Sequence, residues 1–91
     1  RESPAIDIMQ ILEDEKITFD FNDPHVERVK INGTEYKSKS VNTIQPNSLV
    51  LIITDHSSYN WDEIINLTKN IFDTRNALRN VKNSTTNIFK L

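Results

Sequence analysis

The sequence contains no cysteine and only one glycine among its 91 residues. The lack of cysteine excludes disulfides, thiolate metal sites and cysteine nucleophiles from this chain. A single glycine cannot supply the Gly-x-Gly-x-x-Gly loop that cradles a dinucleotide, so we expect no such loop here. The longest apolar run, Leu49 to Ile53, is much shorter than the roughly 20 residues of a membrane span. We therefore expect no membrane span.

Neither positive nor negative charge predominates in the sequence. Eleven Lys and Arg against 13 Asp and Glu give a net charge of −2 at pH 7. Nucleic-acid-binding proteins usually carry a basic face or stripe, so we expect no nucleic-acid partner. The chain shows no secretory signal, because Arg1 leads directly into acidic and helical sequence, and this favours a cytoplasmic protein. The length suits one small domain over residues 1–91.

The first forty residues predict a helix, a strand and a hairpin. Ser3 followed by Pro4 is typical of a helix start, and apolar residues then recur at helical spacing up to an acidic run at 13–15, where we expect the helix to end. Residues 17–21 alternate apolar and polar side chains, which predicts a half-buried strand. Asn32-Gly33 is a turn signal, and it predicts a hairpin of Val26–Ile31 with Thr34–Ser38.

The second half of the chain predicts an α/β fold. Leu49–Thr54 is continuously aliphatic, which is typical of a strand buried on both faces in the middle of a parallel sheet. Asn60 and Glu63 form a capping box that starts a helix. The remaining expected elements are a strand at Ile71–Asp73, a helical turn at Ala77–Val81 and a strand at Asn87–Leu91. This order of helices and strands favours an open, mainly parallel sheet.

Ligands of open α/β sheets bind beyond the carboxyl ends of the strands, and polar clusters follow two of the expected strands. In the first, Asp55-His56-Ser57 is not predicted to be a catalytic triad, because three consecutive residues rarely converge in the required geometry. We expect a loop in which these side chains cap backbone groups. His25 and His56 lack the spacing of a metal site. We therefore predict no catalytic residue and no bound metal.

The second cluster contains the most informative residue, Arg75. A guanidinium group just past a strand end offers a planar fork of donors that suits phosphate or carboxylate. An ion pair with Asp73, or a plain surface position, explains Arg75 equally well from spacing alone. Arg1 has a comparable ambiguity, since it lies just before the first turn of a helix, where anions collect.

Five short motifs connect the chain with a known family. They are Arg1-Glu2-Ser3-Pro4-Ala5, Asp23-Pro24-His25-Val26, Thr54-Asp55-His56-Ser57, Trp61-Asp62-Glu63-Ile64 and Phe72-Asp73-Thr74-Arg75-Asn76-Ala77. In this order they resemble the C-terminal, UDP-binding domain of the UDP-glucose/GDP-mannose dehydrogenase family. The resemblance runs from Arg1 to Leu91 and is least typical at residues 27–46. The third and fifth motifs look most like the branch that oxidises UDP-N-acetylglucosamine or UDP-N-acetylmannosamine.

The resemblance implies a three-layer, Rossmann-like domain of a longer enzyme. Such enzymes oxidise the C6 alcohol of a UDP-sugar to a carboxylate in two NAD-dependent steps, and they serve polysaccharide biosynthesis. The resemblance also implies a homodimer in which an N-terminal domain holds NAD and a middle domain supplies a nucleophilic Cys and a catalytic Lys. By motif match, Arg75 would contact the UDP-sugar. Arg1 would lie near the NAD at the domain interface.

The chain departs from the family pattern in what it lacks. It has no Cys, no NAD domain and no middle domain, so we predict that these residues alone are inactive. It also lacks the family's first strand, which would leave Leu49–Thr54 short of a neighbour unless that strand lies outside these residues or another strand or chain fills the gap. A different class of function stays open. The chain would then be a stand-alone α/β module that docks another protein.

Overall fold

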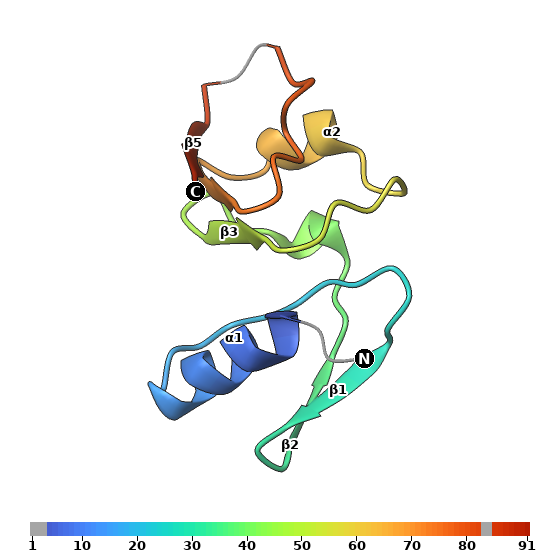
Figure 1. The fold of residues 1–91 in the computed structure, drawn as a ribbon, viewed down its shortest axis with the longest axis vertical. Helices are drawn as coiled ribbons and strands as arrows, with labels where there is room; N and C mark the ends of the chain where they lie inside the picture. Colours follow the sequence, from blue (N-terminus) through green and yellow to red (C-terminus); the bar gives the residue numbers. More distant parts are fainter. Residues whose placement is uncertain (1–3, 83–84) are drawn as a thin grey trace. The chain divides into compact units, whose positions relative to one another are not determined.

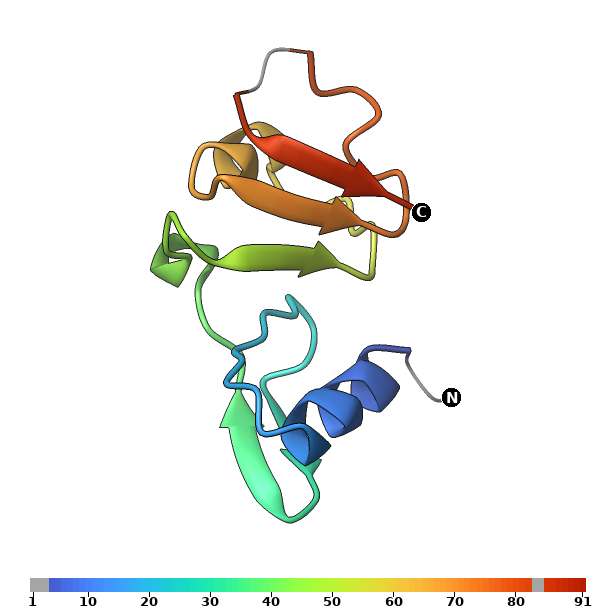
Figure 2. The ribbon, with the colours of Figure 1, turned by 90° about the vertical axis from the view of Figure 1, so that its left-hand side faces the viewer.

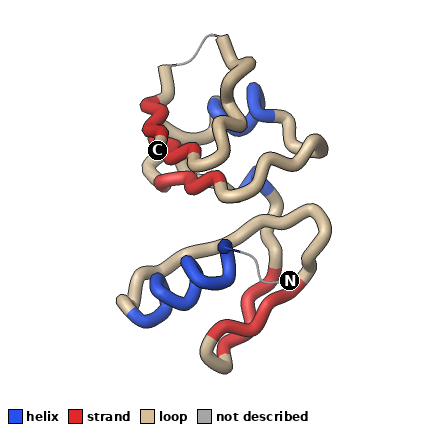
Figure 3. Tube along the Cα trace, in the orientation of Figure 1, coloured by secondary structure: helices blue, strands red, loops and turns tan. Residues whose placement is uncertain are grey.

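The computed structural model describes residues 4–82 and 85–91. The chain divides into two compact units, Arg1–Ser40 and Val41–Leu91. The first holds α1, β1 and β2 (Figure 1). The second holds the short 3-10 helix η1, Val41–Thr43, followed by β3, α2, β4 and β5. Figure 3 shows that loops connect these short helices and strands throughout both units. No helix in the described parts of the chain is long and apolar enough to cross a membrane.

The helix α1 spans Pro4–Asp14 and confirms the predicted helix; the expected capping residue Ser3 lies outside the described residues. Its end is fixed by Lys16, whose φ of 59° lies in the left-handed region. The Ile17 N–H donates to the Leu12 carbonyl at 2.9 Å, and the Lys16 N–H donates to the Glu13 carbonyl at 3.1 Å. This pair of bonds satisfies carbonyls that a helix end otherwise leaves without partners.

The predicted strand at residues 17–21 is wrong. Only Phe21 pairs, through one isolated bridge to Ser38, and the Lys39 N–H donates to the Phe21 carbonyl at 2.9 Å. Phe19 and Phe21 are half-buried while Thr18 and Asp20 are exposed. Ile17 is 54% exposed, so the alternation matches the covered side chains only over residues 18–21. An extended segment can show this pattern without a hydrogen-bonded neighbour on either side.

The predicted hairpin is confirmed. β1, Arg28–Ile31, pairs antiparallel with β2, Thr34–Lys37. Asn32 and Gly33 have φ angles of 49° and 86°, as a two-residue turn of the mirror-image type requires. Ile31 is fully buried in this unit. The ring of Tyr36 packs edge-on against that of Phe19, with 4.6 Å between the ring centroids.

The second unit is built on a parallel sheet. β3, Leu49–Ile52, pairs with β4, Asn70–Asp73, which pairs with β5, Asn87–Lys90. The three strands point the same way (Figure 2). α2, Trp61–Ile65, starts where the Asn60 side chain accepts from the Glu63 backbone N–H at 3.1 Å, so the part of the predicted capping box that Asn60 supplies is confirmed. The α/β class with an open, parallel, Rossmann-like sheet is confirmed as well.

One face of this sheet carries the core of the unit. Val50, Ile71 and Ile88 stand in register across the three strands. Ile71 is fully buried, and Ile64 and Ile65 of α2 belong to the same apolar cluster. Burial of these side chains is the main contribution that holds α2 on the sheet.

One expectation for this unit needs correction. Leu49–Thr54 was expected to be buried on both faces, but β3 is an edge strand of the described sheet, and Leu49 and Leu51 are 62% and 36% exposed. Its alternate residues Val50 and Ile52 face the core, so an aliphatic run does not by itself require two covered faces. The predicted helical turn at 77–81 is confirmed: residues 77–80 form turns, and the Val81 N–H donates to the Leu78 carbonyl at 3.0 Å.

Candidate functional site

The parallel pairing brings the two polar clusters to the same edge of the sheet. The Thr74 N–H donates to the Ile52 carbonyl at 3.1 Å, and the Thr74 hydroxyl donates to the same oxygen at 2.6 Å. These bonds extend the contact between β3 and β4 past their carboxyl ends. Further along, Arg79 Nη1 lies 2.9 Å from Asp55 Oδ2. The loops that follow β3 and β4 are therefore joined, at the strand ends where ligands of open α/β sheets bind.

Asp73 shapes the loop after β4. Its side chain is 1% exposed. Oδ1 accepts the N–H groups of Arg75 and Ala77 at 3.0 Å each, and Oδ2 accepts that of Leu78 at 3.0 Å. One carboxylate thus satisfies three backbone donors of the loop. Buried donors without partners are costly, so this arrangement fixes the backbone path of residues 74–78.

The charge of Asp73 is stabilised in place. Burial alone would raise the pKa of its carboxyl, but the hydrogen bonds from Leu78, Ala77 and Arg75 and the positive charge of Lys90 act in the opposite direction. The net result is a pKa below the ordinary value of 3.8. Asp73 is therefore ionised at neutral pH and acts as an anionic clamp on the loop.

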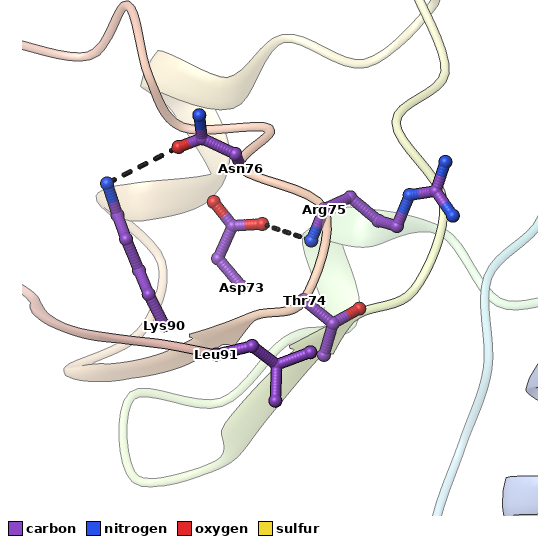
Figure 4. Close-up of a pocket in the computed structure, with 6 residues that line it drawn as sticks. All are labelled: Asp73, Thr74, Arg75, Asn76, Lys90 and Leu91. Carbon is purple, nitrogen blue, oxygen red and sulfur yellow. Dashed lines mark hydrogen bonds between the residues drawn. The ribbon is translucent and has the colours of Figure 1, made fainter.

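An open hollow of about 500 Å³ lies beside this loop (Figure 4). We call it the strand-end hollow; its lining residues are Asp73, Thr74, Arg75, Asn76, Lys90 and Leu91. Arg75 meets Asp73 through its backbone N–H, and its guanidinium group points away from that carboxylate. Among the described residues, none forms an ion pair or hydrogen bond with the Arg75 guanidinium. The structure therefore does not contain the ion pair with Asp73 that spacing had left open.

Sequence reasoning missed Lys90. It is the last residue of β5 and stands in register with Asp73 of β4. Its Nζ lies 3.4 Å from Asn76 Oδ1, and Asn76 itself has a left-handed φ of 56°. The signal that could have found it is a cation at the carboxyl end of a third parallel strand. With Arg75 and Lys90 at its edge, the strand-end hollow is suited to bind an anion.

The other candidate residues that the structure describes make local contacts. Arg1 lies outside the described residues. Asp55 is engaged by Arg79, and the ring of His56 lies 6.0 Å from that of Tyr59, measured between centroids. The His25 N–H donates to Asp23 Oδ1 at 2.7 Å, as expected for a turn. Over residues 4–82 and 85–91, no group of three or more potential ligand side chains could hold a metal ion.

A family comparison agrees with this geometry. The model of the UDP-glucose/GDP-mannose dehydrogenase family, UDP binding domain, matches residues 1–80. Comparisons with curated proteins and with solved structures gave no significant match. The matched residues include both polar clusters and the loop that Asp73 clamps. The chain therefore belongs to the UDP-binding domain of the UDP-glucose/GDP-mannose dehydrogenase family.

Proposed function

We propose that residues 1–91 act as the nucleotide-sugar-binding domain of an NAD-dependent UDP-N-acetylhexosamine 6-dehydrogenase, or of the related UDP-glucose enzyme. The whole enzyme would oxidise the C6 alcohol of the sugar to a carboxylate. Family membership supports the class of enzyme. The motifs at residues 54–57 and 72–77 support an N-acetylhexosamine substrate. Polysaccharide biosynthesis in the cytoplasm is the proposed setting, on the same resemblance.

Arg75 is the proposed ligand of the UDP-sugar. One observation carries this assignment: Asp73 fixes the backbone of Arg75 at the edge of the strand-end hollow while the guanidinium group stays exposed. A ligand phosphate can then engage the guanidinium without first breaking an ion pair to a described residue. Guanidinium forks bind phosphate oxygens in pairs, which favours a nucleoside diphosphate over a neutral ligand.

The described residues do not fit NAD by themselves. The only glycine, Gly33, lies in the turn between β1 and β2, and no parallel strand ends in a glycine-rich loop in the described part of the chain. From the resemblance, we propose that Arg1 approaches NAD at a domain interface. We also propose that the parent enzyme, as a homodimer, supplies the nucleophilic Cys, because this chain contains none.

Two measurements test this function. Amide NMR shifts of the 91-residue chain titrated with UDP are expected to change at residues 73–76. Arg75→Ala should abolish the changes, and the matched control Arg28→Ala, in the hairpin, should keep them. An unresponsive wild-type spectrum would contradict UDP binding and favour a protein-interaction module. Separately, the chain mixed with NAD and a UDP-sugar should form no NADH; NADH formation would refute the claim that catalysis resides elsewhere.

A further inference from the structure

We propose that Lys90 is a second ligand for the diphosphate of the nucleotide, acting with Arg75 across the strand-end hollow. This inference rests on the proposed function, since it takes UDP as the ligand of Arg75. Lys90 lies beyond residues 1–80, the part of the chain that the family model matches. Its role is therefore argued from the geometry of the sheet and the charges around the hollow.

The sheet register places Lys90 at the site. β4 and β5 run parallel, and Asp73 pairs with Lys90 at their carboxyl ends. The Lys90 side chain extends towards Asn76, as Figure 4 shows. Its Nζ reaches Asn76 Oδ1 at 3.4 Å. A neutral amide oxygen at this distance is a weak partner for an ammonium group, so a phosphate oxygen can replace it with a net gain.

The charges around the hollow leave room for an anion. Its lining contains two cations, Arg75 and Lys90, and one acidic side chain, Asp73. Both carboxylate oxygens of Asp73 are already used by three backbone N–H groups. In the described part of the chain, no ion pair within 4.0 Å involves Lys90. Among the lining side chains, Asp73 thus offsets one of two positive charges, and a phosphoryl group can balance the other.

The two cations occupy different places at the hollow. Lys90 points towards Asn76, whereas the guanidinium of Arg75 points away from the other lining residues (Figure 4). A diphosphate offers a separate phosphoryl group to each of these cations, whereas a single phosphate offers only one. We therefore expect Lys90 to distinguish UDP from UMP. Arg75 should contribute to the binding of both.

The test compares dissociation constants of UDP, UMP and uridine for the full 91-residue chain and its variants. Lys90→Met should weaken UDP binding about tenfold, as expected for loss of one charge-assisted hydrogen bond. The same variant should bind UMP within about twofold of the wild-type dissociation constant, because the Lys90 ammonium is proposed to contact only the second phosphate of UDP. The matched control is Lys69→Met, since Lys69 is exposed and directly precedes β4 at its amino end. This control should bind all three ligands as the wild type does.

The outcomes separate this inference from the proposed function. If Arg75→Ala weakens UDP binding and Lys90→Met does not, the role of Lys90 is refuted and the proposed function stands. If Lys90→Met weakens the binding of UDP and UMP equally, or if Lys69→Met has the same effect, Lys90 contributes only to the overall positive potential. The inference then fails. If the wild-type chain binds UDP no better than uridine, the proposed function fails, and the inference with it. Thermal unfolding of each variant checks that the fold is retained.

Discussion

Replacement of Asp73 by asparagine tests whether one carboxylate organises the strand-end loop. Asparagine keeps the shape of the side chain but offers one acceptor oxygen and an NH₂ group. If its oxygen keeps the bonds to Arg75 and Ala77, the NH₂ group faces the Leu78 N–H, which now bonds Oδ2 of Asp73 at 3.0 Å. Two donors then oppose each other at a buried position. The side chain at position 73 thus loses one hydrogen bond outright. Its other two hydrogen bonds remain but no longer have a negatively charged acceptor.

The cost follows from these contacts. A buried N–H without a partner costs about 1–3 kcal/mol. The two remaining bonds lose their charge assistance, which removes roughly half the strength of each, or about 0.5–1 kcal/mol apiece. Asp73→Asn should therefore lower the free energy of unfolding by about 2–5 kcal/mol. Small domains are stable by only about 5–15 kcal/mol in total, so the change is large.

Trp61 provides the assay. It is the only tryptophan and packs against the core of the same unit, so its fluorescence during urea unfolding reports that unit. The matched control is Asp62→Asn, because Asp62 is exposed in the first turn of α2 and its loss should cost less than about 1 kcal/mol. Equal free energies of unfolding for Asp73→Asn and the wild type would refute the role of the Asp73 carboxylate in organising the loop. So would an effect no larger than that of Asp62→Asn.

The pH dependence of the difference in unfolding free energy between the wild type and Asp73→Asn gives a further check. The folded-state pKa of Asp73 lies below the ordinary value of 3.8. The stabilisation by its charge is thus fully present above that ordinary value and is lost as the pH falls through the lower, folded-state pKa. The stability gap between the wild type and Asp73→Asn should narrow in this acidic range. A gap that stays constant down to the lowest pH would contradict a role for the charge.

Three further predictions concern local features. Asn60→Ala removes the acceptor of the Glu63 backbone N–H and should lower the free energy of unfolding by about 1 kcal/mol. Urea unfolding followed by Trp61 fluorescence measures this change, and an unchanged free energy would contradict a stabilising helix cap. Gly33→Ala meets no heavy atom within 4 Å, so its φ of 86° alone should cost about 1–2 kcal/mol, measured by circular dichroism; a neutral result would mean that the turn adapts. The hydrogen bond to Glu13 raises the pKa of Tyr36 above 10.0, so Glu13→Gln should lower it in an ultraviolet titration, and an unchanged titration would contradict the bond.

Features set by neighbours in the sequence could be predicted. The hairpin around Asn32-Gly33 follows from the left-handed backbone that those two residues tolerate. The start of α2 follows from the side chain of Asn60. In each case the deciding contact lies within a few residues, so the sequence contains the whole interaction.

Features set by distant partners could not be predicted. The segment at 17–21 has the alternation of a strand, but its pairing depends on Ser38 and supplies only one bridge. The exposure of Leu49 and Leu51 depends on what covers their face of the sheet, where Phe89 is exposed as well. Lys90 joins the site only through the register of β5 with β4. Periodicity reports which faces of an element are apolar, but not which element lies next to it.

The most direct measurement of UDP binding at the strand-end hollow is the phosphorus NMR spectrum of UDP with the 91-residue chain added. We predict that both phosphate resonances shift or broaden with the wild type. We also predict that Arg75→Ala, with Asp73 and the loop backbone intact, removes the effect. Broadening also detects weak association, as expected for a shallow and open site. Unchanged phosphate resonances with the wild type, or equal changes with Arg75→Ala, would contradict the assignment of Arg75 as the ligand of the nucleotide.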